Sequence, residues 1–143
     1  MDYESFLDDV KERGRFSSRE ESVFVTAAVL RAIAEVLPMA HVEGFAPSVP
    51  QELMVHLRGA HQEPDPYFDS NLFLGWVLAT VDVTGGRDKT EGGLDLFVAY
   101  SADEAVDRCR CVFSTLKSIL DERQSELISI HLPDTIQQIY AES

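Results

Sequence analysis

One glycine-rich segment contains the residue types of a phosphate-binding loop. The segment Gly85-Gly86-Arg87-Asp88-Lys89-Thr90 combines glycines with a lysine and a threonine. A phosphate-binding loop has a glycine directly before the lysine and another five positions earlier, so that backbone N–H groups face the phosphate. Asp88 and Val83 occupy those two positions, and the Asp88 carboxylate would repel phosphate. We therefore interpret the segment as a surface loop and predict no cofactor-binding residues.

The histidines and nearby acids could bind a metal ion, but their spacing argues against it. No two histidines have the i, i+4 spacing of a helical zinc site. His56 and His61, with Glu63 and Asp65, lie close enough in sequence for a weak site. Polar surface residues after a helix end are the simpler interpretation. The acidic residues of 82–95 lack the spacing of an EF-hand. We predict no metal site. The four histidines are His41, His56, His61 and His131.

Residues for nucleophilic or acid–base catalysis are present without a suitable arrangement. The chain has no Gly-x-Ser-x-Gly motif. Cys109 and Cys111 fall at core or near-core positions of an expected helix, pointing to different sides, so we expect neither a disulfide nor a shared metal. The pairs of adjacent acids are expected near first helical turns, where carboxylates are favoured by the helix dipole. We predict no catalytic residues. The acid pairs are Asp8-Asp9, Glu20-Glu21 and Asp103-Glu104.

An apolar segment is the stronger candidate for function. Residues 72–78 read Leu-Phe-Leu-Gly-Trp-Val-Leu, which is apolar on nearly every side of a helix. One side must pack on the protein's own core, and the other would face residues 81–100 or a second subunit. The candidate interaction face comprises Phe73, Trp76, Val77 and Leu78.

The charge of the chain limits its partners. Twelve Lys and Arg oppose 25 Asp and Glu, giving a net charge of −13. Such a chain repels nucleic acid and anionic membranes, so we expect neither as a partner. The longest apolar run, residues 72–81, is too short to span a bilayer. The acidic start differs from a secretory signal, and two cysteines do not make a disulfide scaffold. We therefore expect a cytoplasmic protein.

The chain resembles itself when it is shifted by 83 positions. Residues 17–57 then align with residues 100–140 without a gap, and the apolar positions agree almost throughout. A shared core pattern with a divergent surface is what a duplicated unit should show. The second copy carries 16 extra residues between its first two helices. Aligned pairs include Ser18 with Ser101, Glu21 with Glu104, Val29 with Val112, and Val49-Pro50 with Leu132-Pro133.

The spacing of apolar residues predicts helices throughout both copies. Capping boxes at Ser18-x-x-Glu21 and Ser101-x-x-Glu104 predict the starts of two helices. The helix after Ser18 is apolar on several sides, so we expect it to be central and buried. The other expected helices cover residues 3–13, 39–45, 50–58, 69–80, 125–130 and 133–141.

Residues 81–100 contain the extra segment of the second copy. Two glycine pairs surround a polar stretch there, and Leu94, Leu96, Val98 and Tyr100 then alternate. This alternation permits a small β-hairpin, and an ordered loop with an extra helical turn is an equal alternative. The sequence thus predicts one all-α domain over residues 1–143, with similar halves at 1–58 and 69–143 and a linker at 59–68.

These motifs resemble those of the domain-of-unknown-function family 2267. That family opens with an F-L-x-x-V helix, matched by Phe6-Leu7-x-x-Val10 and Phe73-Leu74-x-x-Val77. It continues with an A-V-L-x-x-L helix, matched by Ala28-Val29-Leu30-x-x-Ile33, and ends with L-P before a final helix. Departures are Val49 in place of leucine and the 16 extra residues. The resemblance implies a duplicated helical fold and implies no activity.

Two hypotheses for function follow from the sequence. The first is a non-enzymatic module that self-associates or binds a protein, because a catalytic constellation is missing and residues 72–78 are apolar. The second is a small-ligand-binding protein or enzyme, with a pocket between the halves covered by residues 81–100, because functional residues favour such loops.

Overall fold

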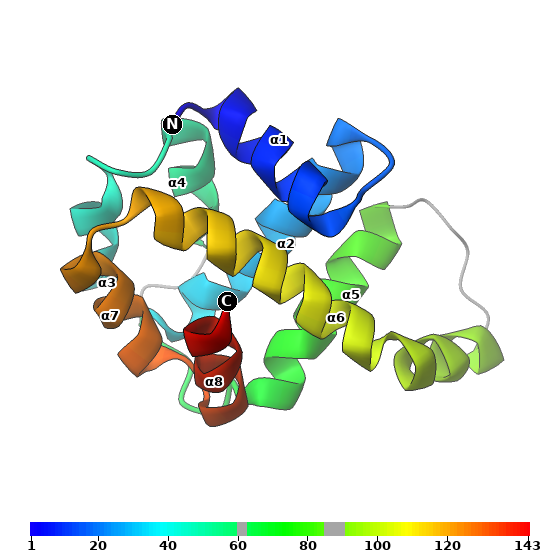
Figure 1. The fold of residues 1–143 in the computed structure, drawn as a ribbon. Helices are drawn as coiled ribbons and strands as arrows, with labels where there is room; N and C mark the ends of the chain where they lie inside the picture. Colours follow the sequence, from blue (N-terminus) through cyan, green and yellow to red (C-terminus); the bar gives the residue numbers. More distant parts are fainter. Residues whose placement is uncertain (60–62, 85–90) are drawn as a thin grey trace.

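Helices form all the regular structure in the described part of the chain (Figure 1). The computed structural model describes residues 1–59, 63–84 and 91–143, with side chains for 1–59, 63–78 and 103–143. The all-α prediction is confirmed. The elements are α1 (Tyr3–Gly14), α2 (Arg19–Val36), α3 (Met39–Val42), a 3-10 turn η1 (Glu43–Phe45), α4 (Gln51–Arg58), α5 (Ser70–Thr84), α6 (Glu91–Ile119), α7 (Glu122–His131) and α8 (Asp134–Glu142).

Helix α2 is the central helix, as its sequence predicts. The Ser18 hydroxyl accepts a hydrogen bond from the Glu21 backbone N–H at 3.1 Å and so caps its start. The Glu21 carboxylate does not complete the capping box, because it accepts a hydrogen bond from the Ser17 hydroxyl at 3.2 Å instead. Val25, Val29 and most other residues of α2 are buried. The helix packs against α1, α4, α5 and α6.

One contiguous core joins the two predicted halves. It includes Phe6 and Ile33 from residues 1–58, and Phe73 and Phe113 from residues 69–143. Helix α6 crosses in front of α2 in Figure 1 and contacts α1, α2, α5 and α8. Each half has the same order of helices, from α1 to α4 and from α5 to α8. Common descent of the halves stays a prediction. Within the described residues, no helix is long and apolar enough to cross a membrane.

The start of α6 differs from the prediction. The helix begins at Glu91 and continues through Ser101, so residues 91–100 form no β-hairpin and Ser101 does not cap a helix start. The alternating apolar residues are separated by Asp95, Phe97 and Ala99. Residues 94–100 contain neither proline nor glycine, and such a run extends a helix more readily than it forms an isolated hairpin. Residues 85–90, the glycine-rich segment interpreted above as a surface loop, lie outside the described part of the chain.

Candidate functional site

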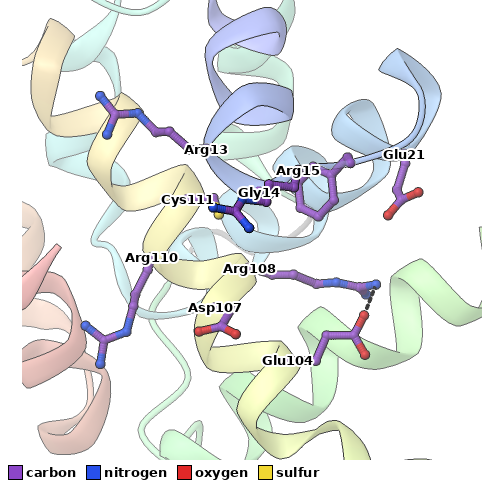
Figure 2. A pocket seen from close by; sticks show the side chains of 10 residues that line it. Arg13, Gly14, Arg15, Glu21, Glu104, Asp107, Arg108, Arg110 and Cys111 are labelled. Carbon is purple, nitrogen blue, oxygen red and sulfur yellow. Dashed lines mark hydrogen bonds and ion pairs between the residues drawn. The ribbon is translucent and has the colours of Figure 1, made fainter.

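A surface pocket lies where α1 ends, α2 begins and α6 passes (Figure 2). Its volume is about 540 Å³. Because α1 belongs to the first half and α6 to the second, both halves contribute to its walls. Charged side chains of both signs line it, together with Gly14, Phe16 and Cys111. The charged residues are Arg13, Arg15, Arg108, Arg110, Glu21, Glu104 and Asp107.

The end of α1 forms the rim of the pocket through a tight backbone turn. The Phe16 N–H donates to the Lys11 carbonyl at 3.0 Å, and the Arg15 N–H donates to the Glu12 carbonyl at 3.3 Å. This is the hydrogen-bond pattern of a Schellman motif. It places Arg15 in the left-handed conformation, with φ of 54°. A Cβ atom on Gly14 would lie 2.4 Å from the Phe16 ring, so glycine allows that ring to fold back over the turn.

Arg108 is the most buried charged side chain of the pocket. Its relative exposure is 8%, and its Nη2 donates to the Glu104 carboxylate at 2.7 Å. Nε and Nη1 are buried and have no hydrogen-bond partner among the described residues. Glu104 was predicted to cap a helix at Ser101. It lies instead inside α6, one turn before Arg108, where the two side chains form an i, i+4 ion pair.

The other three arginines of the pocket differ in their partners. Arg13 pairs with Asp9 at 2.7 Å, and Arg110 pairs with Glu142 at 3.2 Å. Arg15 is exposed and forms no ion pair with any residue that the structure describes. In Figure 2, Arg108 points toward Glu104, whereas Arg110 points to the other side of α6. Among the described residues, Arg15 is therefore the pocket cation without a carboxylate partner, and Arg108 is the one whose buried donors lack an acceptor.

Asp9 connects α1 to α6 beside the pocket. Its carboxylate accepts hydrogen bonds from Thr115 at 2.6 Å and from Arg13 at 2.7 Å. Burial works to raise the pKa of Asp9, but these two hydrogen bonds and the Arg13 charge outweigh burial and lower it. Asp8-Asp9 and Asp103-Glu104 lie in the middle of α1 and α6, so the prediction of first-turn positions is wrong for them. It is confirmed for Glu20-Glu21.

The cysteines are unsuited to nucleophilic chemistry. Both are free thiols, and Cys109 is buried. Burial raises the pKa of Cys109 to about 12, and it also raises the pKa of Cys111. A thiol with a raised pKa holds little of the reactive thiolate at neutral pH. Cys111 therefore contributes a half-buried, weakly polar surface to the pocket wall.

The predicted interaction face on α5 is largely internal. Phe73, Val77 and Leu78 are buried in the protein's own core, whereas Trp76 has a relative exposure of 36%. Leu72 lies one turn before Trp76 and is 46% exposed. We call the exposed residues Tyr67, Leu72 and Trp76 the α5 face.

Hydrogen bonds hold the segment that precedes α5. The Asp65 N–H donates to the Glu35 carbonyl of α2 at 2.9 Å. The Asp65 carboxylate accepts from the Tyr67 N–H at 2.9 Å, and the Asp69 carboxylate accepts from the Leu72 N–H at the same distance. The Trp76 ring meets the buried Phe68 ring edge-on at 5.3 Å between centroids. The chain's own hydrogen bonds thus hold the backbone of the α5 face, and Phe68 packs against the Trp76 ring.

Comparison with known proteins identifies the family. The family described as "Uncharacterized conserved protein (DUF2267)" matches residues 3–139, nearly the whole chain. The chain belongs to the DUF2267 family. No curated protein matches the chain.

The described histidines of this DUF2267 chain do not gather with other metal-binding side chains into a site. His56 accepts a hydrogen bond from Arg31 Nε at 3.3 Å, and His41 and His131 lie with ring centroids 5.7 Å apart. His61, the other histidine of the weak site considered above, lies outside the described residues. No group of three or more metal-binding side chains occurs among the residues that the structure describes.

Sequence reasoning offered a pocket between the halves as an alternative, but it missed the residues that line the pocket of this DUF2267 chain. The available signal was the pair of Arg-x-Arg motifs, Arg13-x-Arg15 and Arg108-x-Arg110, in a chain with nine arginines. The meeting of these two motifs depends on the packing of α1 against α6, which local patterns do not encode.

Proposed function

We propose that this protein is a non-enzymatic interaction module that binds another protein through the α5 face. The observation that supports this most directly is the exposure of three large side chains on α5 and on the short segment before it. Tyr67, Leu72 and Trp76 have relative exposures of 84%, 46% and 36%. Aromatic and large apolar residues dominate the binding energy of protein interfaces. A face that is already ordered loses little entropy when it binds.

Carboxylates near the α5 face favour a particular kind of partner. Glu63 and Asp69 are exposed beside it, and the chain as a whole carries a charge of −13. An apolar centre with an acidic border complements a segment whose apolar residues are flanked by Lys or Arg. A second copy of the chain would bring like charges together, so the proposal favours a basic partner over self-association.

Isothermal titration calorimetry with a synthetic amphipathic peptide of Leu and Lys tests this proposal. We expect the peptide to bind the protein, and the Trp76→Ala and Leu72→Gln variants to lose about tenfold or more in affinity. Val55→Ala is the matched control, because Val55 is exposed on α4, away from the α5 face. Equal affinity for all four proteins would contradict the proposal. A native mass spectrum with a stable dimer that Trp76→Ala dissociates would assign the face to self-association instead.

Small-ligand binding is the second candidate function. It is favoured by the position of the pocket between α1 and α6, which belong to different halves of the chain. That residues 81–100 cover this pocket remains a prediction from the sequence. Nothing in the pocket supplies an activated nucleophile, so the proposal for this site is binding without catalysis.

A further inference from the structure

We infer that the pocket between α1, α2 and α6 binds a small organic carboxylate, which Arg108 and Arg15 hold by its charged group. The inference deepens the second candidate function by naming the class of ligand. It does not depend on the α5 face, which lies on a different helix.

The unsatisfied guanidinium of Arg108 is the first argument. Two of its nitrogens are buried without a hydrogen-bond partner among the described residues. A buried N–H without an acceptor destabilises a fold, and a buried charge does so more strongly. Its one partner, Glu104, is 51% exposed at the side chain and can move aside. When Glu104 moves aside, an incoming carboxylate takes its place on Nη2 and brings a second acceptor oxygen to a guanidinium that the protein leaves incompletely paired.

The balance of charge in the pocket selects the class of anion. Arg13 and Arg110 are paired with Asp9 and Glu142, whose carboxylates lie outside the lining. The positive charge that no described carboxylate pairs therefore comes from Arg15, and Arg108 adds buried donors that lack an acceptor. Glu21 and Asp107 also line the pocket and would repel a doubly charged phosphate more strongly than a single carboxylate.

The size and walls of the pocket indicate an organic ligand. A volume of about 540 Å³ falls within the range of small-molecule sites. The half-buried Phe16 and Cys111 provide apolar wall beside the arginines. A ligand with an acid group and an apolar or aromatic body can satisfy both parts of the lining.

The conformation of Arg15 adds an independent argument. Its left-handed backbone position is one that glycine adopts at no steric expense, and this turn type usually carries glycine there. The chain places an arginine at this position, on the rim of the pocket and without an ion-pair partner among the described residues. A binding role explains why arginine, which adopts the left-handed conformation less readily than glycine, occupies this position.

Amide chemical shifts of the full chain, titrated with sodium benzoate, test the inference. We expect millimolar benzoate to shift amides of residues 13–16, 21, 104, 107, 108, 110 and 111, because these line the pocket. Benzamide, which has the same ring without the charge, should give much smaller shifts. Equal shifts with benzamide, preference for inorganic phosphate, or no shifts with benzoate would each overturn the inference.

Variants separate the proposed role from general effects on folding. We expect Arg108→Met to weaken benzoate binding about tenfold or more, and Arg15→Gly to weaken it about threefold. Arg15→Gly suits its own backbone conformation, so a loss of binding there cannot be assigned to unfolding. Arg123→Gln, at an exposed position on α7, is the matched control and should bind normally. Normal binding by Arg108→Met would overturn the inference.

One further variant distinguishes the two proposals. Trp76→Ala should weaken binding of the basic peptide about tenfold or more and leave benzoate binding unchanged. If benzoate fails to bind and the peptide binds, the carboxylate site is wrong and the interaction module stands. If benzoate shifts the amides around Trp76 instead, the carboxylate site is also wrong.

Discussion

Arg108 places a positive charge beneath the surface of a strongly acidic protein. Only one of its nitrogens has a hydrogen-bond partner among the described residues, although the chain holds 25 carboxylates in all. Structural arginines are usually held by several acceptors, because a buried ion must recover its lost hydration. Arg13 and Arg110 also make one hydrogen bond each, but their side chains are 45% and 40% exposed, so water reaches their remaining donors. The incomplete pairing of Arg108 is what distinguishes this pocket from an ordinary surface hollow.

Arg15→Gly should stabilise the protein although it removes a charge from the pocket. The left-handed conformation disfavours a residue with a Cβ atom, so we expect the free energy of unfolding to rise by about 0.5–1 kcal/mol. Urea denaturation measures this change. Arg13→Gly is the matched control, since Arg13 lies within α1 and glycine there should lower stability by about 1 kcal/mol. A decrease for Arg15→Gly would show that its side chain holds the turn together.

His56 should make stability depend on pH just below neutrality. Burial, and secondarily the Arg31 charge, lowers the pKa of His56 below its ordinary value of 6.5. The unfolded chain therefore takes up a proton at a higher pH than the folded chain does. Stability contributed by neutral His56 is complete above about pH 6.5 and decreases as pH falls through the lowered pKa.

The His56→Gln variant tests this dependence. Glutamine keeps an acceptor for Arg31 and does not titrate. We expect the urea midpoint of the natural chain to fall between about pH 7 and about pH 5.5 more steeply than that of the variant. Identical slopes for the two proteins would assign the pH dependence to other groups.

At the scale of the helices, most boundaries could be predicted from local chemistry. The capped start at Ser18, the expected short helix at 39–45 and the end of α4 before Gly59 all agree with the structure. The motif at Ser101 failed because Ser-x-x-Glu is compatible with a helix interior when nothing upstream stops the helix. The α5 face was predicted only in part, because periodicity does not distinguish buried Phe73 from exposed Leu72 on an almost wholly apolar helix.

The two Ser-x-x-Glu motifs, at Ser18 and at Ser101, should respond differently to an alanine substitution of the serine. Ser18→Ala removes the hydroxyl that accepts the Glu21 N–H, so we expect it to lower the free energy of unfolding by about 1 kcal/mol. Ser101→Ala changes a residue inside α6, where alanine favours the helix, and should leave stability unchanged or slightly raised. Thermal unfolding of both variants measures the difference. An equal loss for both would mean that α6 begins at Ser101.

At the scale of the whole molecule, a row of aromatic rings joins the surface to the core. Trp76 contacts Phe68, Phe68 contacts Phe73, and Phe73 contacts Phe113 at 6.2 Å between centroids. Phe113 then meets Tyr140 of α8 at 5.0 Å. The row passes through α5, α6 and α8, so the core supports the α5 face directly. Such contacts between distant residues could not be predicted from sequence, for the same reason that the arginine lining of the pocket was missed.

Phe113→Ala should destabilise both halves of the chain together. Phe113 is fully buried between Phe73 and Tyr140, and its truncation should lower the free energy of unfolding by about 3–5 kcal/mol. Urea denaturation followed by circular dichroism and by tryptophan emission should give coincident transitions, because one core joins the halves. Val55→Ala, at an exposed position, should change stability by less than about 0.5 kcal/mol. Separate transitions would show that the halves unfold independently.

The emission maximum of Trp76 tests the proposed interaction role most directly. Trp76 is the only tryptophan of the chain and lies on the α5 face, so its emission reports on that surface alone. We predict that the basic amphipathic peptide shifts the emission to shorter wavelength as the ring loses contact with water. The shift should saturate, weaken with added salt, and require higher peptide concentrations in Leu72→Gln. Saturable peptide binding that leaves Trp76 emission unchanged would contradict the α5 face as the binding surface.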